Sequence, residues 1–133
     1  MARIDWAILC ESAFLDRQNR LCIISVIRKL PTESLPVTLR QIMLIGRLVD
    51  LKPVEELAIA AGVVTSSGIH LARPDSDQTA IEMASEYILV TFRDLPLIEE
   101  GVHRFQLMLR GQPVVSVEVP VLTNHHTSSI RVQ

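Results

Sequence analysis

The side chains that could act as nucleophiles do not stand in a catalytic pattern. A serine or cysteine nucleophile needs a base and an oxyanion hole beside it, and on β folds these groups come from loops. Ser66-Ser67-Gly68 lacks the strand–Gly-x-Ser-x-Gly–helix context of a nucleophile elbow and is typical of a hairpin turn. The five glycines are scattered, so no phosphate-binding loop is present. We therefore expect neither catalysis nor a cofactor, and keep a cryptic enzyme as an alternative.

Histidines and loop carboxylates are the candidate metal ligands. His125 and His126 are adjacent, and neighbours on an extended strand point to opposite sides, so we expect a solvated tail there rather than an ion site. Loop oxygens could form a calcium site of the C2 kind, and the candidates are Asp16, Asn19, Asp75, Asp77, Asp94, Glu99 and Glu100. These residues are widely spaced and common in ordinary turns. We expect no metal, and keep a calcium- or ligand-dependent binding domain as a second alternative.

Composition and charge limit the partners. The chain carries 13 Lys+Arg against 15 Asp+Glu, so its total charge does not favour nucleic acid. No stretch approaches the roughly 18 uncharged apolar residues of a membrane span, and Asp5 interrupts the apolar region that a signal peptide needs. We expect a soluble cytoplasmic protein that binds neither nucleic acid nor membrane.

The two cysteines are expected to be free thiols. If Leu15 pairs with Leu21 in a hairpin, Cys10 lies opposite Val26. Cys22 is then offset from Cys10 by four residues, roughly 13 Å at about 3.3 Å per residue. A disulfide needs Cα atoms within about 7 Å, so this register excludes the bond.

The elements that must position these side chains are β-strands. Hydrophobic residues make up 48% of the chain and aromatic residues only 4%, so the core must consist of Val, Ile and Leu, which favour strands. Turn signals recur about every ten residues. The pattern predicts an all-β fold: a two-sheet antiparallel β-sandwich of about seven to eight strands with at most one short helix, in a domain over 1–122 with a flexible tail over 123–133. The expected strands are Ile4–Phe14, Leu21–Lys29, Val37–Val49, Leu57–Val64, Ile69–Ala72, Ala80–Phe92, Val102–Arg110 and Val114–Val121.

Two windows also match helix signals. Residues 53–62 begin with Pro53, carry acids in the first turn and close with Gly62, while Thr79 and Glu82 form a capping-box pattern over 79–87. Alternating apolar residues in the first window and high β-propensity in the second favour strands. Helix stays as the alternative in both windows.

The last hairpin provides a test of register. Its apolar residues fall on odd positions in both strands, with His103, Phe105, Leu107 and Leu109 facing Val115, Val117, Val119 and Val121. Odd residues can oppose odd residues only if the loop has an odd length. The three residues Arg110-Gly111-Gln112 are the expected loop.

One strand, Val37–Val49, is apolar on both faces. A two-layer sandwich buries only the inner face of each sheet, so the other face needs a cover. We expect a second copy or another protein there, and the alternative is cover within the chain by the tail or by one of the helix windows. The expected interface residues are Ile42, Leu44, Met43, Ile45, Ile24 and Val26.

The order of elements resembles a bacterial family of uncharacterised small β-sandwich proteins. The resemblance rests on Ala7–Cys10, Leu21–Ile27, Met43–Val49, Val63–Gly68, Gly101–Phe105 and Gly111–Val121. It implies an immunoglobulin-like or C2-like β-sandwich and supplies no active-site residues. Together with the doubly apolar strand, it leads us to expect a non-catalytic interaction or assembly module.

Overall fold

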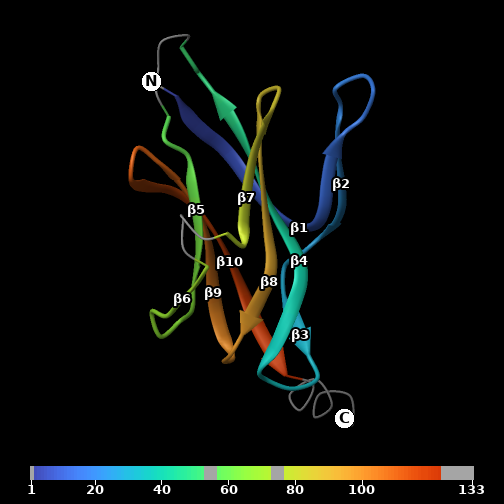
Figure 1. Cartoon of the computed structure of the whole chain (residues 1–133), viewed down its shortest axis with the longest axis vertical. Helices are drawn as coiled ribbons and strands as arrows, with labels where there is room; N and C mark the ends of the chain where they lie inside the picture. Colours follow the sequence, from blue (N-terminus) through green and yellow to red (C-terminus); the bar gives the residue numbers. More distant parts are fainter. Residues whose placement is uncertain (1, 53–56, 73–76, 124–133) are drawn as a thin grey trace.

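The computed structural model describes residues 2–52, 57–72 and 77–123, and in these ranges its regular elements are ten β-strands (Figure 1). The first sheet has the order β2-β1-β4-β8-β7, formed by Leu21–Val26, Arg3–Leu15, Val37–Val49, Tyr87–Leu97 and Thr79–Ala84. The second sheet has the order β3-β10-β9-β5-β6, formed by Leu30–Thr32, Gln112–Thr123, Gly101–Leu109, Ala60–Val64 and His70–Ala72. The all-β class and the division into two sheets are confirmed.

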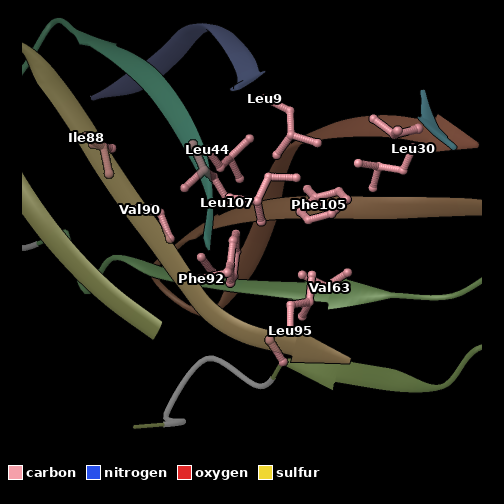
Figure 2. Close-up of a cluster of buried hydrophobic side chains, with 14 of the residues drawn as sticks. Leu9, Leu30, Leu44, Val63, Ile88, Val90, Phe92, Leu95, Phe105 and Leu107 are labelled. Atoms are coloured by element: carbon pink, nitrogen blue, oxygen red, sulfur yellow. The ribbon is translucent and has the colours of Figure 1, made fainter. Parts of the chain in front are cut away.

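Both sheets contribute to one main core. Figure 2 shows Leu44 and Phe92 of the first sheet among Val63 and Phe105 of the second. The rings of Phe92 and Phe105 meet edge to face with centroids 5.8 Å apart, an arrangement that aromatic pairs favour. A Cβ at Gly46 would lie 2.7 Å from Leu107 Cδ1, so glycine allows β4 to approach the β9 side chains closely. The apolar sides of the sheets therefore bury one another.

The described residues form ten strands rather than the expected seven or eight, because the sequence pattern did not indicate the short turns and short strands. The stretch Ala80–Phe92 forms two strands, β7 and β8, joined by the two-residue turn Ser85-Glu86. Ser85 has a φ of 57°, a region that usually selects Gly or Asn, so the sequence lacks the ordinary hairpin signal. The helix alternative for 79–87 is wrong.

Other expected boundaries also shift. The expected strand Leu57–Val64 begins only at Ala60, after Ala58 with a φ of 45°, and residues 57–59 are not helical. The rest of that helix window, 53–56, lies outside the described residues. The strand from Leu21 ends at Val26 rather than Lys29, and β8 continues to Leu97 instead of ending at Phe92.

A short strand, β3, lies where a turn was expected. Its middle residue is Pro31, which is tolerated at a sheet edge because no ladder hydrogen bond is lost there. The strand pairs in parallel with β10, from Leu30 with Val121 to Thr32 with Thr123. The expected sheets were wholly antiparallel. The second sheet is instead mixed.

The last hairpin confirms the predicted face but corrects the loop. Val115 pairs with Leu107 and Val119 with His103, so odd residues oppose odd residues. The turn has two residues, Arg110 and Gly111, with φ values of 53° and 78°, as in a type I′ turn. A register shift between Pro113 and Val115 restores the odd pairing that a two-residue turn would otherwise prevent.

The first hairpin has the predicted register. Leu15 pairs with Leu21, and Cys10 with Val26, and both cysteines are free. β1 pairs with β4 only from Arg3 to Cys10, whereas the rest of β1 pairs with β2. Figure 1 shows β1 descending beside β4 and then turning upward with β2. The far half of this hairpin has therefore left the plane of the first sheet.

Candidate functional site

The outer face of the first sheet carries a second hydrophobic cluster. Its buried members are Cys10, Ala13, Met43, Ile45 and Leu89, and Trp6, Leu21, Ile23, Ala84 and Tyr87 pack against it. The Ala13 amide lies 3.3 Å from Met43 Sδ, which places the far half of the β1–β2 hairpin over β4. Among the described residues, the cover of the doubly apolar strand is thus a bent hairpin of the same chain. The expected tail, apart from Thr123, and residues 53–56 lie outside the described residues.

Four of the six expected interface residues are core residues in the isolated chain. Ile42 and Leu44 belong to the main core, and Met43 and Ile45 belong to the second cluster. The two faces of β4 were identified correctly, but each of them is buried within the chain. These side chains do not line an exposed surface of this fold.

The other two expected interface residues, Ile24 and Val26, are exposed on β2 at 48% and 53%. A third large apolar side chain, Phe14, is 47% exposed on the neighbouring strand. Phe14 pairs with Cys22, and Ser12 with Ile24, so these four residues share the outward face of the hairpin. Phe14 was not among the expected interface residues, although the expected pairing of Leu15 with Leu21 sets Phe14 opposite Cys22.

The edge of β2 is free of a partner strand within the described part of the chain. Asp16 N donates to Arg20 O at 3.0 Å, so this pair is hydrogen-bonded. Hydrogen-bonded and non-hydrogen-bonded pairs alternate along an antiparallel ladder, so the next pair, Leu15 with Leu21, is not hydrogen-bonded. The backbone N–H and C=O groups of Leu21 and Ile23 therefore point toward this free edge. No residue of β2 is charged, which is unusual because charged side chains commonly protect sheet edges.

Positive charges flank this neutral edge. Arg17 and Arg20 precede β2, and Arg28 and Lys29 follow it. Arg20 Nε lies 2.8 Å from Asp16 Oδ2, whereas the other three cations form no ion pair or hydrogen bond with the described residues. Both ends of β2 are therefore basic, on a chain whose net charge is −2.

The Asp16 carboxylate closes the β1–β2 turn. Its Oδ1 accepts the amides of Gln18 and Arg20 at 2.8 and 2.9 Å. The pKa of Asp16 lies below its usual value, first because the Arg20 amide stabilises the charged form and also through the Arg20 side chain and the Gln18 amide. Asp16 thus has a structural role in the turn, as its residue type suggested.

The described members of the expected calcium set do not form one site. Figure 1 places the β1–β2 turn, which contains Asp16, and the end of β8, which follows Asp94, at opposite ends of the molecule. Asp75 lies outside the described residues, as do His125 and His126. Among residues 2–52, 57–72 and 77–123, no group of three or more His, Cys, Asp or Glu side chains could hold a metal ion.

A polar cluster lies where the turn at 65–68 meets the start of β9. Ser67 Oγ donates to Glu99 Oε1 at 2.6 Å, and this bond is the largest cause that holds the Glu99 pKa below its usual value. The His103 ring lies nearby but bonds elsewhere, with Nδ1 2.9 Å from Gly101 O and a buried Nε2 that has no partner in the described chain. Ser67 is thus bonded to a carboxylate rather than an imidazole, an arrangement that orders the turn.

A sequence family matches residues 5–122, from within β1 to within β10, and it is described as a family of unknown function, DUF6941. The chain belongs to DUF6941. The expected relation to an uncharacterised family is therefore confirmed. No curated protein and no solved structure matches this DUF6941 chain. In the part of the chain that the structure describes, no helix is long and apolar enough to cross a membrane.

Proposed function

We propose that this DUF6941 chain is a non-catalytic protein-binding module whose contact surface is the outward face and free edge of the β1–β2 hairpin. The observation that carries the proposal is the exposure of Phe14 and Ile24 on the outward face of a hairpin whose other face is packed, with Val26 exposed at the end of the same strand. Apolar side chains that gather beside an unpaired strand are typical of sites where an extended segment adds to a sheet.

Binding rather than catalysis is supported by the state of the potential nucleophiles. Burial raises the pKa of the Cys10 thiol, which disfavours the reactive thiolate at neutral pH. The Ser67 hydroxyl is engaged by Glu99. Among the described residues, neither group is hydrogen-bonded to an imidazole, which is the usual base beside a catalytic serine or cysteine.

The finer classification belongs to the same proposal. The main core shared by both sheets supports a β-sandwich, and the resemblance discussed above favours an immunoglobulin-like or C2-like arrangement. We also propose that the protein is cytoplasmic and of bacterial origin.

Site-specific photo-crosslinking tests the contact surface. A benzophenone amino acid replaces Ile24 in one variant and Val114 of β10, exposed at 44%, in the control. After irradiation in cells of the source organism, position 24 should form a protein adduct and position 114 should not. Mass spectrometry then shows whether the adduct is a second copy or another protein. Adducts at neither position, or equal adducts at both, contradict the proposal.

A further inference from the structure

Within residues 2–52, 57–72 and 77–123, the first sheet has two long edges without a partner strand, and the second sheet has none of that length. β2 and β7 each have six residues and each lies at an edge, whereas the edge strands β3 and β6 have three residues each. Very short edge strands are poor templates for pairing. Any strand addition by the described chain is therefore favoured at β2 or β7.

The two long edges carry opposite charge. Residues 17–29 contain four cations and no acid, whereas residues 77–92 contain three acids, Asp77, Glu82 and Glu86, and no cation. Glu86 is paired with Arg47, its Oε2 2.7 Å from Arg47 Nε. Asp77 and Glu82 are exposed and have no ion pair or hydrogen bond within the described residues. Each edge thus has charges that pair with no described residue and that the other edge could neutralise.

We propose that β2 of one copy pairs antiparallel with β7 of a second copy, so that their first sheets become continuous. The inference rests on the proposed function and names the partner at the same surface. Arg20 and Arg28 lie on either side of β2 and are eight residues apart. Asp77 and Glu86 lie on either side of β7 and are nine residues apart, so the charges at the two edges have a similar spacing. Antiparallel pairing sets Arg28 and Lys29 beside Asp77.

The apolar side chains at the two edges agree with this pairing. Ile24 and Val26 on β2 and Met83 on β7 are each more than 40% exposed. Pairing of the two strands covers part of these side chains and satisfies the free backbone groups of Leu21 and Ile23. A β2–β2 pair would also cover apolar surface, but it would bring the cations of one copy toward those of the other.

The pairing joins two different surfaces and is therefore heterologous. Such a contact leaves one β2 and one β7 edge open in each complex, so association continues into a chain or closes into a ring. We expect the mean mass of the purified protein to rise beyond that of a dimer as its concentration increases. Raised salt should weaken the association, because exposed charges are screened.

Charge reversal at both edges tests the pairing by sedimentation velocity. Arg28→Glu with Lys29→Glu makes the 28–29 end of the β2 edge acidic, and Asp77→Lys with Glu82→Lys makes the matching part of the β7 edge basic. Each double variant alone should associate at least about tenfold more weakly than the native chain, because like charges then face one another. An equimolar mixture should regain association, since the acidic β2 edge of one variant matches the basic β7 edge of the other. The control, Lys52→Glu with Arg104→Glu, makes the same charge change at exposed sites on neither edge and should associate as the native chain does.

A native chain that stays monomeric at tens of micromolar overturns the inference. A closed dimer that tolerates reversal at Asp77 and Glu82, or a mixture that regains nothing, overturns it as well. Circular dichroism of each variant confirms that these surface changes leave the fold intact. If the chain is monomeric while position 24 crosslinks to a different protein, this inference fails and the proposed function stands.

Discussion

Cys10 and Cys22 have the same chemistry and opposite surroundings. Cys10 is buried in the second cluster, and burial raises the pKa of its thiol above 9.0. Cys22 lies half-buried on the outward face of the hairpin. Because the native state favours the neutral Cys10 thiol, this group stabilises the fold below pH 9.0 and the contribution is lost as pH rises through the native pKa.

We predict that the free energy of unfolding falls above pH 9.0 with a component that Cys10→Ala removes. Urea titrations between neutral and alkaline pH measure it. Other groups that titrate in this range contribute equally to both chains, so the difference between their pH profiles isolates Cys10. Identical pH profiles for the native chain and Cys10→Ala would contradict the assignment.

At the residue scale, strand register predicted the positions of side chains better than residue type did. The pairing of Leu15 with Leu21 followed from a turn and two strands, and it separated the cysteines correctly. Strict alternation along the whole of β1 would place Phe14 on the same face as Ile4 and Trp6. A register shift between Ile4 and Trp6 and the bend beyond Cys10 break that alternation, and neither carries a Gly or Pro signal.

Turn geometry at the element scale leads to a second prediction. Ser85 occupies a φ of 57°, which costs a residue with a Cβ about 1 kcal/mol or more. Ser85→Gly should therefore stabilise the fold by about 0.5–1 kcal/mol in denaturant titrations. Ser116→Gly is the matched control, because Ser116 is exposed in the regular strand β10. It should destabilise the fold by about 0.5–1 kcal/mol, and equal signs for the two variants would refute the argument.

Burial of both faces of β4 leads to a third prediction. Glutamate at Ile42 and Leu44 should unfold the domain, and glutamate at Met43 and Ile45 should do the same, because each pair places unpaired carboxylates in a buried cluster. Circular dichroism at neutral pH measures the outcome. Glutamate at Ile24 and Val26 is the control and should leave the spectrum native, because both side chains are exposed. A folded monomer carrying glutamate at positions 43 and 45 would show that the second cluster is dispensable.

The apolar pattern of β4 could be predicted, and its cover could not. Residues 42–45 alternate between two clusters, which indicated two buried faces from the sequence. The covering element depends on a bend after Cys10 that brings Ala13 to Met43, and bends of this kind leave no mark in local propensity. The β7–β8 turn could not be predicted for the same reason, because Ser85 occupies a position where glycine or asparagine is usual.

For the whole molecule, we predict that both hydrophobic clusters unfold in one transition. Leu44 and Val90 of the main core lie next to Met43, Ile45 and Leu89 of the second cluster on the same strands, so neither cluster can open alone without disturbing β4 and β8. Trp6 fluorescence reports the second cluster, and far-ultraviolet circular dichroism reports all strands. The two denaturation curves should coincide. Loss of the Trp6 signal at lower denaturant would show that the hairpin opens separately.

The parallel pairing of β3 with β10 bears on how the chain reaches its fold. Leu30 pairs with Val121, so β3 waits for the last of the described strands to be synthesised. A nascent chain that ends before β10 can form the β1–β2 hairpin and still lacks the strand between β3 and β9. Because contacts between distant residues slow the search for the native state, we expect folding in milliseconds to seconds and only after release of the complete domain from the ribosome.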